Sequence, residues 1–259
     1  MGIFDGVLLC TDIDGTLIRK IGSNSLQKVV SEKNINAINY FKSQGGLFTF
    51  ATGRYSDFYL ERDFGVEPNT YIISLNGTVI GDTFGKEVLH TSIMDEGVVK
   101  EICSFANDIL NLNYLLVHSS ELKIQHYNEC KDFSKTNKIV MCTHSVEEAL
   151  KLKEALVKNF SEKVIISRSW DTGVEALNLN STKGDALVKL KEITNSKITV
   201  SCGDYENDIE LIKMADYGFA VANALDEVKS FARFVTKNDN EHDAVSEVIY
   251  TLEQILTNK

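Results

Sequence analysis

Two carboxylates stand two residues apart just after a short apolar run near the N-terminus. In an extended segment the side chains at positions i and i+2 point the same way, so Asp12 and Asp14 can face one site. A calcium-binding EF-hand loop does not fit, because its third acidic position falls on Thr16 and its glycine position on Leu17. We interpret the pair as a catalytic or cation-binding site, with a solvated turn as the alternative.

Two further motifs could hold an anion. Thr52 and Gly53 follow an apolar run, and a hydroxyl with free backbone N–H groups at the start of a helix forms an anion cradle. Lys183 stands at the predicted start of another helix, where its charge opposes the helix dipole unless an anion lies nearby. Taken singly, the first motif is also compatible with an ordinary turn and the second with an exposed lysine.

The fourth motif is acidic and also follows an apolar run. Asp204, Glu206 and Asp208 surround Asn207 at a predicted strand-to-helix turn. Such a group can bind a hard cation or cap the helix, but capping explains one acid and not the cluster. The chain has neither a GxxxxGK(S/T) nor a GxGxxG segment, so nucleotide-binding folds of those types lack their main support.

The elements that must position these motifs alternate between short apolar runs and helical patterns. This alternation is typical of βαβ units and predicts a largely parallel sheet. In such a sheet, ligands bind at the carboxyl ends of the strands, where the motifs stand. A helix is also expected just after Arg54. The other expected elements are strands at 7–10, 47–51, 71–75, 198–202, 219–221 and 234–235, with helices starting near Ser31, Lys183 and Asp208.

The middle of the chain has a different pattern. Short strands separated by turn residues are expected there, together with two amphipathic helices, and this combination indicates an inserted α+β module. The second helix opens with a capping box at Ser145 to Glu148. We therefore predict a discontinuous α/β core from residues 1–80 and 180–259, with the module at 81–179. The strands expected in this middle part of the chain are 78–80, 87–90, 114–117 and 122–127, and its helices run through 98–109 and 145–160.

Composition and charge exclude several classes of protein. Hydrophobic residues make up 43% of the 259 residues, which indicates a folded protein. The 27 basic and 37 acidic residues give a net charge of −10, so we expect no nucleic-acid partner. No apolar run is long enough for a membrane helix, and the N-terminus lacks the features of a signal peptide, so a cytoplasmic location is expected. Five cysteines without CxxC spacing argue against a disulfide framework and a zinc site.

The order of the four motifs resembles that of the haloacid dehalogenase (HAD) superfamily phosphatases. The closer resemblance is to the Cof-like type, in which a type IIB cap is inserted between the second and third motifs. It covers essentially the whole chain and implies a Rossmann-like core. Tyr205 departs from the pattern, because many members have a small residue there. The resemblance also includes the segments Ser74–Gly77, Val221–Ala224 and Asn240–Asp243.

The resemblance implies a role for each motif. Asp12 would attack phosphorus to give an aspartyl-phosphate, and Asp14 would act as general acid and then as general base. One Mg²⁺ would be held by Asp12, the Asp14 backbone carbonyl and Asp204, with Asp208 supporting the site. The phosphoryl oxygens would be held by Thr52, Gly53, Lys183 and Asn207.

The expected activity is Mg²⁺-dependent hydrolysis of small phosphorylated metabolites, sugar phosphates above all. Two alternatives stay open. One is a phosphomutase that uses the same aspartyl-phosphate, and the other is a phosphometabolite-binding regulator, which the presence of both Asp12 and Asp14 disfavours. The expected assembly is a monomer or a homodimer. Candidates for contact with the rest of the substrate are Arg54 and Asn76, and less specifically His118, Arg168 and Trp170.

Overall fold

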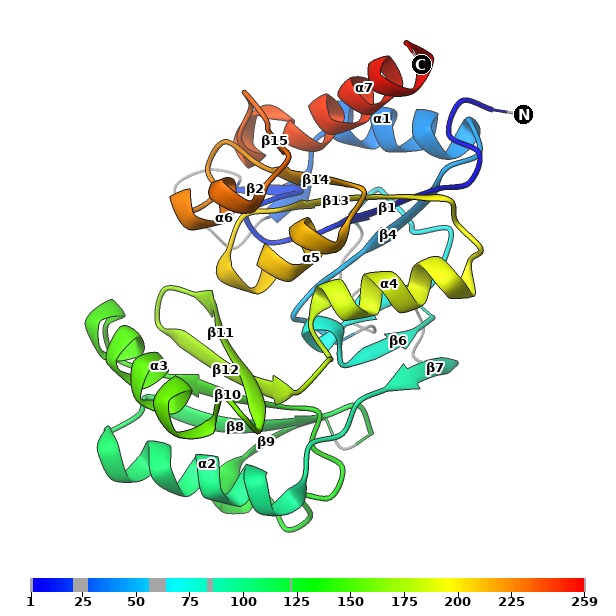
Figure 1. Ribbon diagram of the computed structural model, residues 1–259. Helices are drawn as coiled ribbons and strands as arrows, with labels where there is room; N and C mark the ends of the chain where they lie inside the picture. The colour runs from blue at the N-terminus through cyan, green and yellow to red at the C-terminus, as the bar shows by residue number, and fades with distance from the viewer. Residues whose placement is uncertain (1, 21–27, 56–63, 83–85, 122, 259) are drawn as a thin grey trace.

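The computed structural model describes residues 2–20, 28–55, 64–82, 86–121 and 123–258, and Figure 1 shows that they form two parts. The first part is built on a five-stranded sheet in the order β15-β14-β13-β1-β4, with every neighbouring pair parallel. The parallel sheet predicted from the alternating pattern is therefore present. Its strands are β1 (Val7–Thr11), β4 (Leu47–Phe50), β13 (Ile198–Gly203), β14 (Tyr217–Ala220) and β15 (Phe234–Val235).

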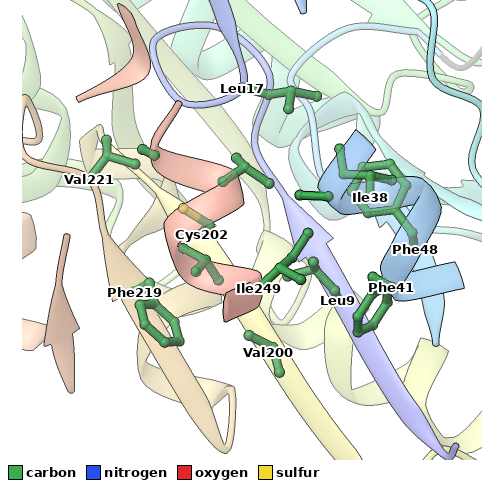
Figure 2. Packing of buried hydrophobic residues seen from close by; sticks show 14 of the residues in the cluster. Leu9, Leu17, Ile38, Phe41, Phe48, Val200, Cys202, Phe219, Val221 and Ile249 are labelled. Atoms are coloured by element: carbon green, nitrogen blue, oxygen red, sulfur yellow. The ribbon is translucent and has the colours of Figure 1, made fainter. Parts of the chain in front are cut away.

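Helices cover both faces of this sheet, because successive residues of its strands point to opposite sides. Along β1, Leu9 packs in one apolar cluster with Phe41 and Ile249, whereas Leu8 packs in another with Leu187. Figure 2 shows Leu9 beside the side chains of the two helices on its face. These two helices are α1 (Glu32–Ser43) and α7 (Ala244–Thr257), and the other helices of this part are α4 (Lys183–Ile193), α5 (Ile209–Met214) and α6 (Asp226–Phe231).

Side-chain caps begin the helices where the sequence predicts them. The Ser31 side chain accepts a hydrogen bond from the backbone N–H of Asn34, and Thr182 forms a full capping box with Asp185 at the start of α4. The helix expected after Arg54 lies outside the described residues. None of the described helices is long and apolar enough to cross a membrane.

The second part is a five-stranded antiparallel sheet in the order β11-β12-β10-β8-β9. Two helices cover the face of this sheet that points away from the core (Figure 1). This matches the predicted α+β cap, although the sequence analysis did not predict β10, β11 and β12. The elements are α2 (Glu96–Ile109), α3 (Val146–Phe160), β8 (Tyr114–Ser119), β9 (Lys123–His126), β10 (Lys138–Cys142), β11 (Val164–Trp170) and β12 (Gly173–Asn178).

The first connection from the core to this second sheet passes through three short strands. Strands β5 (Ile72–Ser74), β6 (Val79–Gly81) and β7 (Val88–Thr91) form one antiparallel sheet, and β5 also bridges to Ala51, directly after the core strand β4. Met94 is the first residue after β7 that packs in the apolar cluster of the cap. We therefore propose a core–cap boundary between residues 91 and 94 in place of residue 81, while the second boundary near residue 180 stays a prediction.

A short hairpin separates the first carboxylate motif from α1. It pairs β2 (Ile18–Lys20) with β3 (Lys28–Val30), and the sequence analysis did not predict it. Four short 3₁₀ turns complete the described elements: Leu75–Gly77, Tyr127–Glu129, Glu206–Asp208 and Asn240–His242.

Candidate active site

Asp12 lies directly beyond β1, and the sheet itself fixes its backbone. Its N–H donates to the carbonyl of Cys202 on the neighbouring strand β13, at 2.9 Å. Gly15 follows with φ at +88°, and a Cβ atom there would lie 2.4 Å from Oδ2 of Asp204. Only glycine combines that backbone angle with so close an approach, so Gly15 lets the loop carrying Asp12 meet the acidic loop.

Three buried carboxylates meet at this end of the sheet. Oxygen atoms of Asp12, Asp204 and Asp208 lie within 4.8 Å of one another. The hydroxyl of Thr16 donates to Oδ1 of Asp204 at 2.7 Å, and the backbone N–H groups of Asp204 and Tyr205 donate to Oδ2 of Asp208 at 3.0 and 3.2 Å. The cluster is therefore held in place by neighbours and offers hard oxygen ligands to a cation.

Lys183 supplies a positive charge to this cluster from the first turn of α4. Its side chain is fully buried, and Nζ donates to Oδ1 of Asp12 and to Oδ1 of Asp208, each at 2.6 Å. Burial lowers the pKa of Lys183, but the two carboxylates outweigh that effect and raise the pKa overall. The predicted anion beside this lysine is thus present as two side chains.

The charge of the cluster does not balance. Burial raises the pKa of Asp204 to about 7, with Asp208 adding to the effect. Burial likewise raises the pKa of Asp12, against the opposing influence of Lys183. Three carboxylates and one ammonium leave negative charge in a low-dielectric site, and a divalent cation would offset it. The donor set therefore fits a metal ion.

The side chain of Asp14 lies outside this cluster of carboxylates. Arg54 Nε donates to Asp14 Oδ2 at 2.7 Å and Nη2 donates to Oδ1 at 2.8 Å, in a half-exposed bidentate pair. Asp14 is therefore expected to contact a metal ion only through its backbone carbonyl, as the resemblance implies. This ion pair was not predicted from the sequence, and its two charge-assisted hydrogen bonds hold the Asp14 carboxyl group against Arg54.

The predicted phosphate-binding residues lie around the same point. Thr52 is buried, and its Oγ1 accepts from the backbone N–H of Arg54 at 3.2 Å. Asn207 donates through Nδ2 to Oδ1 of Asn76 at 3.0 Å. Asn76, expected to contact substrate, instead lies behind Gly53, where a Cβ atom on Gly53 would approach its side-chain oxygen to 3.1 Å.

A cavity of about 590 Å³ joins these residues to the second sheet. Asp12, Asp14 and Thr52 contribute to its wall on the core side. The cap side is lined by alternate residues of β8 and β10 and by Glu175 of β12, because only one face of that sheet points toward the core. These cap residues include Tyr114, Leu116, His118, Lys138, Val140 and Glu175.

Two charged groups that join the cap to the core escaped the sequence analysis. One is the buried pair of Lys138 and Glu175 on the cap face. The other centres on Glu206, which the fourth motif contains but whose partners the sequence did not indicate. Glu206 accepts from Nζ of Lys153 at 2.6 Å and from Nε of Arg168 at 2.7 Å. Arg168, a candidate substrate contact, is thus bound to the acidic loop. A charged residue inside an otherwise apolar strand is the signal that could have indicated Lys138 and Glu175.

Comparison with known proteins agrees with this geometry. The sequence model of a family described as haloacid dehalogenase-like hydrolase matches residues 9–139 and 118–249. The chain is 25% identical to 5-amino-6-(5-phospho-D-ribitylamino)uracil phosphatase YitU of Bacillus subtilis, over 92% of this chain and 94% of that protein. It is 27% identical to phosphoglycolate phosphatase 2 of Saccharolobus solfataricus, over 90% and 87%. A solved structure of a haloacid dehalogenase-like hydrolase from B. subtilis superposes with a TM-score of 0.78 at 22% identity. The superposition covers 95% of this chain and 99% of that one.

Proposed function

The chain belongs to the haloacid dehalogenase-like hydrolase family and is a phosphatase, and we propose that it hydrolyses small phosphorylated metabolites through an aspartyl-phosphate on Asp12. The observation that carries the proposal is the position of Asp12. It lies at the carboxyl end of β1, lines the cavity and accepts a hydrogen bond from Lys183. The metal ion is proposed to be Mg²⁺, and the substrates are proposed to be sugar phosphates.

The first step forms one bond and breaks another. A carboxylate oxygen of Asp12 bonds to phosphorus while the bond from phosphorus to the ester oxygen breaks, leaving an alkoxide. Asp14, which takes up a proton from solvent once Arg54 has left it, gives that proton to the alkoxide. In the second step Asp14 takes a proton from water, whose oxygen attacks phosphorus and releases phosphate and the Asp12 carboxylate.

Asp14 can act as an acid only after it has lost its contact with Arg54, because the bidentate pair favours the carboxylate. The substrate supplies an alternative partner for Arg54, since the phosphoryl group is itself an anion with planar pairs of oxygens. We infer that Arg54 moves from Asp14 toward the substrate when the substrate binds. This movement would couple the protonation of Asp14 to the occupation of the cavity.

The residues that would hold Mg²⁺ are Asp12, Asp204 and the Asp14 carbonyl, with Asp208 supporting them. When bound, the ion would lower the repulsion between the Asp12 carboxylate and the phosphoryl group. Lys183 is placed to act in the same direction, because its Nζ already contacts Asp12 at 2.6 Å.

Removal of the metal tests the proposal. Treatment with EDTA followed by dialysis is expected to abolish hydrolysis of p-nitrophenyl phosphate, and added Mg²⁺ is expected to restore it. Mg²⁺ should also raise the midpoint of thermal unfolding of the treated protein, because a ligand that binds only the folded state stabilises it. Turnover that survives complete chelation would contradict the assignment of the acidic cluster.

Asp14→Asn is expected to separate two kinds of substrate. An aryl oxide leaves without a proton, whereas a sugar alkoxide needs one, so kcat on a hexose 6-phosphate should fall at least tenfold further than kcat on p-nitrophenyl phosphate. Steady-state kinetics on both esters measure the difference. Asp239→Asn, which changes a carboxylate outside the cavity, is the control. Equal losses on the two esters would contradict Asp14 as the general acid.

The size and lining of the cavity support the proposed substrate class. About 590 Å³ accommodates a phosphorylated small molecule, and the cap side combines apolar with polar groups. A purified-protein screen against a panel of phosphorylated metabolites identifies the substrate. Analysis of the products from a hexose 1-phosphate distinguishes phosphate release from the phosphomutase alternative, in which the phosphoryl group would reappear on a second hydroxyl.

A further inference from the structure

One ion pair of the cap reaches into the phosphate-binding region of the core. Lys138 of β10 and Glu175 of β12 are only 3% and 2% exposed by their side chains, and Nζ lies 2.8 Å from Oε1. Lys138 Nζ also donates to the backbone carbonyl of Gly53 at 2.9 Å. Glu175 accepts from the side-chain amide of Asn76 and from the hydroxyl of Ser169. The pair therefore contacts the core at two separate points.

The placement of this pair is not explained by the packing of the cap. Its residues lie on the face of the second sheet that points to the cavity, whereas the opposite face packs on α2 and α3 through apolar residues such as Ile139 and Ala176. Replacing a buried ion pair by apolar residues is often neutral or stabilising. The contacts that Lys138 and Glu175 make with the core are thus a better explanation than the stability of the cap.

The contact of Lys138 fixes the orientation of one peptide group. In a trans peptide the C=O and the following N–H point in opposite directions, so holding the Gly53 carbonyl toward the cap directs the N–H of Arg54 the other way. That N–H donates to Oγ1 of Thr52 at 3.2 Å. Because the oxygen of Thr52 accepts there, its hydroxyl proton is left to donate to a phosphoryl oxygen.

The contact of Glu175 fixes the orientation of a side-chain amide. The Nδ2 group of Asn76 donates to Glu175 and to Ser169, and this leaves its Oδ1 directed at Asn207. Asn207 in turn donates through Nδ2 to that oxygen at 3.0 Å. Reversal of the Asn76 amide would place two N–H groups against each other, so Glu175 determines how Asn207 is presented.

We propose that Lys138 and Glu175 are positioning residues that set Thr52 and Asn207 for phosphoryl binding when the cap packs on the core. The inference rests on the proposed function, which assigns the phosphoryl oxygens to Thr52, Gly53 and Asn207. The phosphoryl group is common to every substrate. Loss of the pair therefore weakens catalysis on all phosphate esters by the same factor and leaves their ranking unchanged.

The test compares Lys138→Met with Lys151→Met. Lys151 pairs with Glu147 on the exposed side of α3. The substitution Lys151→Met therefore removes the same charge from the cap without altering a contact with the core. In Lys138→Met, kcat/KM on p-nitrophenyl phosphate and on a hexose 6-phosphate should both fall about tenfold, and the inhibition constant of inorganic phosphate should rise by a similar factor. Lys138→Arg should recover part of the loss, and Lys151→Met should match the wild type.

Lys138→Met leaves Glu175 buried without its cation, so the double variant Lys138→Met/Glu175→Gln is measured beside it. The double variant should unfold cooperatively and still show weakened binding of inorganic phosphate. The proposal would be overturned if the double variant bound inorganic phosphate as tightly as the wild type does. It would also be overturned if kcat/KM fell on one ester alone while the inhibition constant of inorganic phosphate stayed unchanged. Failure of the wild type to hydrolyse the hexose phosphate would contradict only the substrate class, because p-nitrophenyl phosphate and inorganic phosphate still report on the pair.

Discussion

Replacement of Asp12 by Asn is expected to lower kcat on every phosphate ester by roughly three orders of magnitude or more. The substitution keeps the shape of the side chain and its place at the end of β1, but it removes the charge of the attacking oxygen. Among the described acidic residues, Asp12, Asp14 and Glu175 line the cavity, and Glu175 lies on the cap side of it. Asp14 pairs with Arg54 and Glu175 with Lys138, and the proposed function assigns the nucleophile to Asp12.

The loss in Asp12→Asn should appear in kcat and not in folding. Stability is expected to change little or to rise, because the buried carboxylate whose pKa is raised by burial is replaced by a neutral amide. Steady-state kinetics and urea unfolding of the same preparation separate the two effects. Asp226→Asn, in an exposed side chain at the start of α6, serves as the control.

A covalent readout makes the Asp12 prediction sharper. Rapid quenching of the wild type during turnover should give a protein heavier by one phosphoryl group, and peptide mapping should place that group on Asp12. Asp12→Asn should give no such species. A phosphoryl group that maps to another residue would contradict the mechanism even where the variant is inactive.

The parts of the fold that the sequence predicted are those with a local cause. An apolar run followed by a polar motif marked the ends of β1, β4 and β13, and capping residues marked the starts of α1 and α3. The residues of the four motifs were equally visible, because each motif follows a predicted strand or opens a predicted helix and their order along the chain resembles that of a known family. The carboxyl ends of neighbouring parallel strands then bring Asp12 and Asp204 together.

The parts that the sequence did not predict depend on partners far along the chain. Strand β10 begins with Lys138 and strand β12 carries Glu175, and both charges interrupt the apolar patterns that identify strands. Each charge is tolerated only because the other lies diagonally across from it on the paired strand and the core supplies hydrogen bonds. The pairing of Arg54 with Asp14 is similar, because residues 40 positions apart meet only once β1 and β4 lie side by side.

Replacement of Lys183 by Met is expected to destabilise the metal-free protein by about 3–5 kcal/mol at pH 8 and to abolish most of its activity. Methionine fills a similar volume but leaves Asp12 and Asp208 without the ammonium that contacts both at 2.6 Å. The effect on activity has the same origin, because the phosphoryl group would then approach an uncompensated cluster of carboxylates.

The deficit in Lys183→Met should depend on pH with a defined sign. Burial already raises the pKa values of Asp204, to about 7, and of Asp12 above their unfolded values. A carboxyl group whose pKa is higher in the folded state stabilises the fold at low pH, and that stability is lost as the pH rises through the folded pKa. Loss of the Lys183 ammonium raises the folded pKa values of Asp12 and Asp204 further. The deficit should therefore be small near pH 5 and grow as the pH rises through 7.

Urea unfolding at pH 5.5 and pH 8, with and without Mg²⁺, measures this dependence. Added Mg²⁺ should recover part of the stability at pH 8, because it offsets the same excess of negative charge. Lys191→Met is the matched control, since Lys191 lies in the last turn of the same helix and pairs with Asp216 at the surface. It should change stability by no more than about 0.5 kcal/mol. A deficit of equal size at both pH values would show that Lys183 contributes through packing and not through its charge.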